Sequence, residues 1–129
     1  MPEQPDRILL AEDDRFLRKA AEATLKRHGF EVCTAADGEE ALRLARVALP
    51  DLILLDLIMP KLHGFEVLHS LKHDPSTAQI PVIVLSNLGQ DSDVHQALEA
   101  GAVAYYVKSN ISLQDLVKQI QRVLHESRV

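Results

Sequence analysis

Polar side chains that could do chemistry stand directly at the ends of several apolar segments. A run of acids follows the first segment, one carboxylate follows the third, a hydroxyl ends the fourth and an ammonium follows the fifth: Glu12, Asp13 and Asp14, then Asp56, Ser86 and Lys108. If these segments are parallel strands, their carboxyl ends share one edge of the sheet, where open α/β sheets place their sites. Residues far apart in the sequence would then form one site.

Carboxylates gathered at one edge repel one another, and a divalent cation relieves that repulsion. Oxygen ligands favour Mg²⁺, Mn²⁺ or Ca²⁺ over zinc. Mg²⁺ commonly binds one or two carboxylates and leaves room for phosphate oxygens. With the Lys108 ammonium and the Ser86 hydroxyl nearby, such a site could hold a phosphoryl group, and Asp56 would be the nucleophile that forms an acyl phosphate.

Each of these residues also has a purely structural interpretation. Asp and Ser often follow strands because they suit turns and helix caps. Taken alone, any one of them is better explained as a cap. The combination of acids after the first and third segments, a hydroxyl on the fourth and a lysine after the fifth favours a functional site.

The elements that must position these side chains alternate between strands and helices. We expect strands at 7–12, 31–35, 51–55, 81–86 and 102–107, and helices at 14–28, 37–47, 64–72, 91–100 and from 112 onward. The second strand alternates polar and apolar residues more than the others, which favours an edge position. The alternation predicts an α/β fold, a doubly wound parallel (βα)5 sheet with helices on both faces.

Length and composition are those of one globular domain. The chain has 129 residues, of which 47% are hydrophobic and 26% charged, and its net charge is −5. The negative charge argues against direct binding of nucleic acid. No apolar run approaches the roughly 18 residues of a membrane span, and the polar start lacks a signal-peptide core, so we expect no membrane association and a cytoplasmic location.

Four short segments resemble the receiver domain of response regulators in bacterial two-component signalling. They read ILLAEDD at 8–14, LILLDLIMP at 52–60 with Gly64 beyond it, VIVLSN at 82–87 and AYYVK at 104–108. Each is weak alone, but together their order and spacing are specific. The resemblance spans a single domain at 7–125 between short tails at 1–6 and 126–129, and it implies a flavodoxin-like, CheY-like fold with strand order 2-1-3-4-5.

The resemblance implies a role for each acidic residue of the site. Asp56 would be the phosphoacceptor, and its donor would be a sensor histidine kinase or a histidine phosphotransfer protein. Mg²⁺, or Mn²⁺ in its place, would be the cofactor. Its ligands would be Glu12, Asp13, Asp56 and the backbone carbonyl of Ile58.

The resemblance also implies a switch. Ser86 and Lys108 would contact the phosphoryl oxygens, and Tyr105 would turn inward when Ser86 moves onto the phosphoryl group. The changed surface, at 91–126, would bind an output protein that the sequence does not identify. Phosphoryl transfer and its reversal by hydrolysis would be self-catalysed, so we do not expect an enzyme with a separate substrate.

One departure from the family pattern and one pair of aliphatic residues bear on these expectations. Ser109 follows Lys108, where the family usually has proline after a cis bond. A cis bond before a non-proline residue costs roughly 2.5–4 kcal/mol, so this bond is either trans or a strained cis. Ile58 and Leu88, two residues beyond Asp56 and Ser86, are both aliphatic, and we expect them to slow hydrolysis of the phosphorylated state.

Other functions remain as alternatives. One is a receiver-like interaction scaffold that is never phosphorylated, and another is the receiver fragment of a larger multidomain regulator. A phosphohydrolase with an aspartate nucleophile usually needs a second acid where Ile58 stands, and a cap domain. The pair His69 and His73 has the spacing of a helical zinc site, but no further ligand is evident, and we interpret it as a solvated face.

Overall fold

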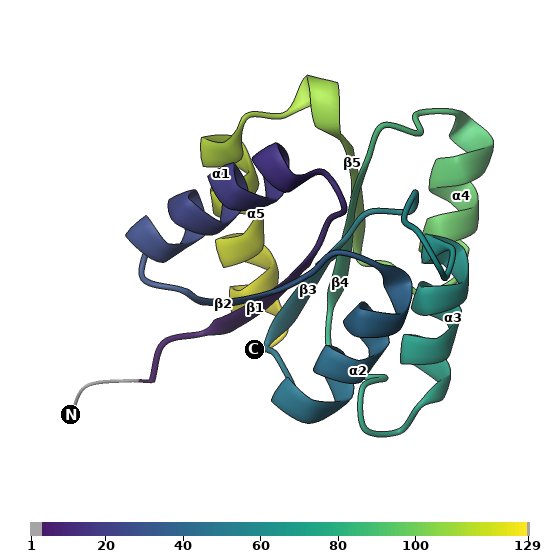
Figure 1. Cartoon of the computed structure of the whole chain (residues 1–129), viewed down its shortest axis with the longest axis horizontal. Helices are drawn as coiled ribbons and strands as arrows, with labels where there is room; N and C mark the ends of the chain where they lie inside the picture. The colour runs from purple at the N-terminus through teal and green to yellow at the C-terminus, as the bar shows by residue number, and fades with distance from the viewer. Residues whose placement is uncertain (1–3, 129) are drawn as a thin grey trace.

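Five parallel strands form the centre of the structure, a computed structural model that describes residues 4–128 (Figure 1). The strands are β1 (Arg7–Ala11), β2 (Glu31–Ala35), β3 (Leu52–Leu55), β4 (Val82–Ser86) and β5 (Ala104–Val107). The helices are α1 (Arg15–Arg27), α2 (Gly38–Ala48), α3 (Gly64–His73), α4 (Asp91–Glu99) and α5 (Leu113–Glu126), with a short 3-10 turn, η1 (Lys108–Asn110), before α5. Within residues 4–128, no helix is long and apolar enough to cross a membrane.

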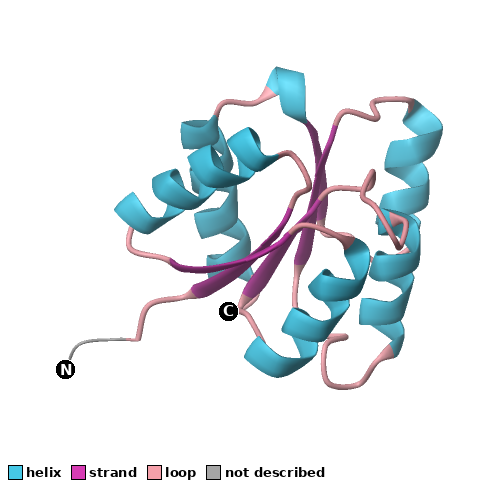
Figure 2. Ribbon diagram, viewed as in Figure 1, coloured by secondary structure: helices cyan, strands magenta, loops and turns pink. Residues whose placement is uncertain are grey.

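The strand order is β2-β1-β3-β4-β5, as expected, and all neighbouring strands are parallel. Helices α1 and α5 cover one face of the sheet, and α2, α3 and α4 cover the other (Figure 2). The alternating strand β2 lies at one edge, as its pattern predicted. The doubly wound α/β fold is therefore confirmed.

Strand β3 is buried on both faces because its four aliphatic side chains serve two cores. Ile53 and Leu55 pack with residues of α2, α3 and α4, whereas Leu52 and Leu54 pack with residues of α1 and α5. All four are at most 1% exposed. The continuous apolar run before Asp56 is thus explained by a central strand with a helical layer on each side.

Several element ends differ from the expected ones, and a helix cap explains one of them. Helix α1 begins at Arg15 because the Asp14 carboxylate caps it, accepting hydrogen bonds from the amides of Phe16 and Leu17. Strand β3 begins at Leu52, and the Asp51 carboxylate accepts a hydrogen bond from the Arg7 amide. Strands β1, β4 and β5 are also shorter than expected, and η1 was not predicted.

The predicted domain limits at 7 and 125 stay a prediction. Residues 1–3 and 129 of the predicted tails lie outside the described residues. The carbonyl of Asp6 accepts a hydrogen bond from the amide of Glu31 at the start of β2, and α5 continues to Glu126.

Candidate functional site

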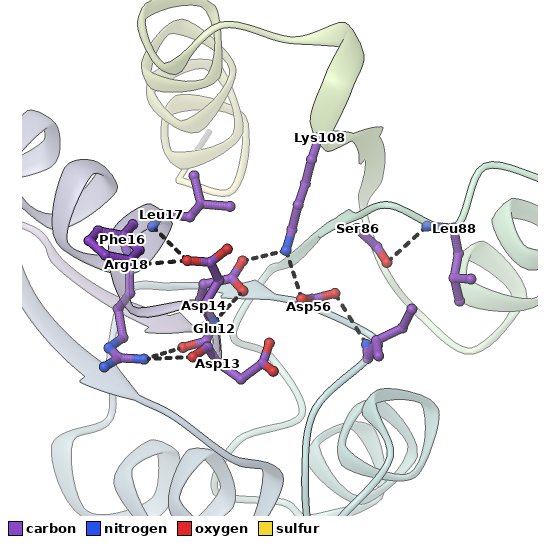
Figure 3. A network of polar contacts seen from close by, with 11 residues as sticks. Glu12, Asp13, Asp14, Phe16, Leu17, Arg18, Asp56, Ser86, Leu88 and Lys108 are labelled. Atoms are coloured by element: carbon purple, nitrogen blue, oxygen red, sulfur yellow. Dashed lines mark hydrogen bonds and ion pairs between the residues drawn. The ribbon is translucent and has the colours of Figure 1, made fainter.

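The predicted site residues meet at the carboxyl edge of the sheet (Figure 3). Glu12 directly follows β1, Asp56 directly follows β3, Ser86 is the last residue of β4 and Lys108 directly follows β5. The register aligns the ends of neighbouring strands, with Ala11 opposite Leu55. The expectation that these residues share one edge is therefore met.

Three carboxylates form a cluster that could hold a metal ion. One oxygen each from Glu12, Asp13 and Asp56 lie within 4.8 Å of one another. Glu12 and Asp56 are 2% and 4% exposed, whereas Asp13 is exposed. A hard oxygen donor set that is buried on one side and open to water on the other fits Mg²⁺, which keeps several water ligands. These three carboxylates could therefore hold a divalent cation, and their role as Mg²⁺ ligands stays a prediction.

The Lys108 ammonium bridges two of these carboxylates. Its Nζ lies 2.6 Å from Glu12 Oε1 and 2.8 Å from Asp56 Oδ2. Burial lowers the pKa of Lys108, but its hydrogen bonds to Asp56 and Glu12 outweigh that effect and the pKa is raised. Burial raises the pKa of Glu12, and the bond from Lys108 offsets this only in part. The peptide bond between Lys108 and Ser109 is trans, which answers the question left open by the missing proline.

The loop after Asp56 is folded tightly against the end of β3. Asp56 Oδ1 accepts a hydrogen bond from the Ile58 amide at 3.1 Å, so the second carboxylate oxygen is oriented as well. The Gly64 amide donates to the Leu57 carbonyl at 2.9 Å. A Cβ on Gly64 would lie 2.3 Å from Leu57 Cα. This close contact is the physical reason for a glycine at position 64.

Ser86 and Tyr105 are linked through Leu88. Ser86 is fully buried, and its hydroxyl oxygen accepts a hydrogen bond from the Leu88 amide at 3.2 Å. The Tyr105 hydroxyl donates to the Leu88 carbonyl at 2.5 Å. Burial is the main cause that raises the pKa of Tyr105, and the charge of Asp93 adds to it. The neighbouring Tyr106 packs against the opposite core, and its hydroxyl bonds to Gln119 on α5.

Two residues near the acids lie outside the predicted ligand set: Asp14, for which a capping role was one interpretation, and Arg18, which the sequence did not single out. Asp14 lies outside the carboxylate cluster and caps α1. Arg18 donates from Nη1 to the carbonyls of Glu12 and Asp13. The signal that could have found Arg18 is its position one helical turn beyond the capping residue, which places its side chain over the preceding loop.

The family model described as the response regulator receiver domain matches residues 8–121. The chain is 42% identical over 117 residues to the gliding motility regulatory protein of Myxococcus xanthus, covering 91% of this chain and 15% of that protein. It is 46% identical over 101 residues to the transcriptional regulatory protein AfsQ1 of Streptomyces coelicolor, covering 78% of this chain and 44% of that protein. The chain thus spans less than half of either relative.

Solved structures of similar proteins agree with the fold. The CheY-like response regulator receiver domain protein of Methanospirillum hungatei has a TM-score of 0.88 at 28% identity, with 97% of this chain and 98% of that chain covered. The chemotaxis response regulator CheY4 of Vibrio cholerae has a TM-score of 0.86 at 31% identity, with 93% and 99% covered. Together with the family match, these findings place the chain in the response regulator receiver domain family.

Proposed function

We propose that this receiver domain accepts a phosphoryl group on Asp56, with Mg²⁺ bound beside it, and that phosphorylation changes a partner-binding surface. The observation that carries the proposal is the carboxylate cluster. Oxygens of Glu12, Asp13 and Asp56 lie within 4.8 Å of one another, and the Lys108 ammonium contacts two of these residues. The donor would be a sensor histidine kinase or a histidine phosphotransfer protein, which is the kind of partner that two-component receivers have.

The chain's own residues would bind and orient the reacting groups. Glu12, Asp13, Asp56 and the Ile58 carbonyl would hold Mg²⁺, which when bound supplies positive charge to the transferring phosphoryl oxygens. An oxygen of the Asp56 carboxylate attacks phosphorus, the phosphorus–nitrogen bond of the donor phosphohistidine breaks, and the leaving imidazole nitrogen keeps the bonding electron pair and takes up a proton. Lys108, which already contacts Asp56, would turn its ammonium to a phosphoryl oxygen.

The link between Ser86, Leu88 and Tyr105 would transmit the change. If the Ser86 hydroxyl turns to a phosphoryl oxygen, its bond from the Leu88 amide is weakened or lost. Because the Tyr105 hydroxyl holds the Leu88 carbonyl, a shift of this segment moves Tyr105 as well. Phosphorylation would thereby favour one of two arrangements that are both present beforehand. The output surface would be residues 91–126, and its partner would be another protein or another part of a longer protein.

The phosphorylated state would be hydrolysed by the domain itself, without a separate substrate. Ile58, in the loop that follows Asp56, is half exposed, and Leu88 packs partly against the core. Both side chains are apolar and neither can orient an attacking water by hydrogen bonding. We therefore expect a slow hydrolysis.

Intact-mass measurement after incubation with acetyl phosphate tests the proposal. Wild-type protein in Mg²⁺ is expected to gain one phosphoryl group, and protein with a chelator in place of Mg²⁺ is expected to gain little. Asp56→Asn removes the nucleophile and keeps nearly the same volume, so it should gain none. Absence of an adduct on the wild type with acetyl phosphate and with phosphoramidate would favour the unphosphorylated scaffold instead.

A further inference from the structure

We propose that Arg18 is a positioning residue for the acidic loop, holding the backbone of Glu12 and Asp13 so that their carboxylates are correctly placed for a divalent cation. The inference rests on the proposed function, because it assigns a support to the metal ligands of that site. It concerns the affinity for the metal itself, which can be measured without phosphorylation.

One nitrogen of Arg18 contacts two successive carbonyl groups. Its Nη1 lies 2.9 Å from the Glu12 oxygen and 3.2 Å from the Asp13 oxygen. In Figure 3 the guanidinium lies on one side of this backbone, while Lys108 and Asp56 lie on the other. Arg18 therefore binds the backbone of residues 12 and 13 on the side away from Lys108 and Asp56, and it does not occupy the metal site.

The fold directs Arg18 to this place. Asp14 caps α1, and the Arg18 amide makes a helical bond to the Asp14 carbonyl at 2.9 Å. Arg18 thus stands one turn into the helix. Side chains in a helix are tilted toward its N-terminus, so the long arginine side chain reaches back over residues 12 and 13.

Two backbone amides of the loop have other partners. The Glu12 amide donates to the Ala35 carbonyl at 2.9 Å, and the Asp14 amide donates to Glu12 Oε2 at 3.0 Å. The carbonyls of Glu12 and Asp13 are the groups that Arg18 holds. Because the Asp13 carboxylate is exposed, its position depends on the backbone that carries it more than on packing.

Charge and position act in opposite directions here, which makes the proposal testable. Arg18 is a cation close to a site for another cation, so by charge alone its removal would strengthen Mg²⁺ binding. By position, its removal would weaken binding, because partners that orient metal ligands typically contribute about 10-fold or more to affinity. The sign of the change therefore separates the two effects.

Calorimetric titration of the unphosphorylated, metal-free protein with Mg²⁺ measures this sign. Arg18→Gln is expected to weaken Mg²⁺ binding about 10-fold. Arg18→Lys keeps the charge but loses the rigid planar fork, and it should bind Mg²⁺ less tightly than wild type and more tightly than Arg18→Gln. The matched control is Arg15→Gln, which removes the same charge from the exposed first turn of α1 and should leave binding unchanged or slightly tighter.

Amide hydrogen exchange of residues 13 and 14 in the metal-free protein gives a second readout, and it should be faster in Arg18→Gln than in the control. Folding of each variant is checked by circular dichroism. A folded Arg18→Gln that binds Mg²⁺ as tightly as wild type overturns the inference and leaves the proposed function intact. If Arg18→Gln does not fold, Arg18→Lys decides: an Mg²⁺ affinity equal to that of wild type overturns the inference about Arg18. A wild type that binds no Mg²⁺ overturns both.

Discussion

Replacing Lys108 by methionine should destabilise the metal-free protein by about 3 kcal/mol. The Lys108 side chain is 13% exposed, and it contacts the carboxylates of Glu12 and Asp56, whose side chains are 3% and 5% exposed. Breaking such a pair leaves two buried carboxylates without their cation, which costs roughly 3–5 kcal/mol in a fully buried setting. We take the lower end because Asp13 at the same site is exposed to water. Methionine keeps the length of the side chain, so little packing is lost.

The same substitution should make the protein respond more strongly to Mg²⁺ and to acid. Without the competing ammonium, Mg²⁺ meets two free carboxylates, and a ligand that binds only the folded state stabilises it. Burial already raises the pKa of Glu12 above its ordinary 4.5, so the folded state binds a proton more readily than the unfolded state. Stability from this group is gained as the pH falls through its folded pKa. Removing Lys108 raises that pKa further, and the deficit of the variant should shrink as the pH falls through the raised pKa of Glu12 toward its ordinary value of 4.5.

Urea unfolding followed by circular dichroism, with a chelator and then with Mg²⁺, measures these effects. Wild type and Lys108→Met should differ in midpoint and not in the slope m. The expected loss corresponds to a melting temperature roughly 10 °C lower. An exposed ion pair contributes at most about 1 kcal/mol. If Lys108→Met loses less stability than this in the presence of the chelator, the ion pair does not have the strength that its burial implies. A deficit that Mg²⁺ does not reduce would also refute the reasoning.

Three further predictions follow from single features. Gly64→Ala would place a Cβ 2.3 Å from backbone and should cost about 3 kcal/mol in urea unfolding, whereas Gly29→Ala, at a positive φ with open space, should cost about 1 kcal/mol. Hydrogen bonds from the Ser76 amide, the Ser76 hydroxyl and the Arg46 guanidinium lower the pKa of Asp74 below its ordinary 3.8. The ionised carboxylate therefore stabilises the fold above pH 3.8, and this stabilisation is lost as the pH falls through the pKa of the folded state. In urea unfolding, the difference in stability between wild type and Asp74→Asn should disappear over that pH range. Ile58→Asn and Leu88→Glu should each speed the loss of label from the phosphorylated protein, and unchanged rates would contradict the expectation of slow hydrolysis.

The sheet could be predicted from the sequence because its strands are short, apolar and separated by helices. Strand β3 is an example: four aliphatic residues in a row, followed closely by an acid and a proline, are typical of a short strand covered on both faces. The ends of β1 and β5 were less predictable, since Glu12, Ala102 and Val103 carry no signal that separates the last strand residue from the first loop residue. In the structure β1 ends at Ala11 and β5 begins at Ala104, although the Glu12 amide still donates to the Ala35 carbonyl and the Val103 amide to the Val82 carbonyl.

The membership of the site could also be predicted, but its contacts could not. The residues at the strand ends followed from parallel topology, which brings carboxyl ends together. That Lys108 contacts both Glu12 and Asp56 depends on side-chain rotamers, which the residue types do not specify. Arg18 and Tyr105 both bond to backbone carbonyls, those of Glu12 and Leu88. Because every residue has a backbone carbonyl, the residue types do not predict these contacts.

The most direct test of the central claim is to locate the phosphoryl group on the chain. Protein incubated with acetyl phosphate and Mg²⁺ is treated with borohydride, which reduces an aspartyl phosphate to homoserine, and its peptides are sequenced by mass spectrometry. We expect homoserine at position 56 in the Mg²⁺ sample and unmodified aspartate there in a sample kept with chelator. Homoserine at position 13 or 14 in place of 56, or none at all, would contradict this expectation.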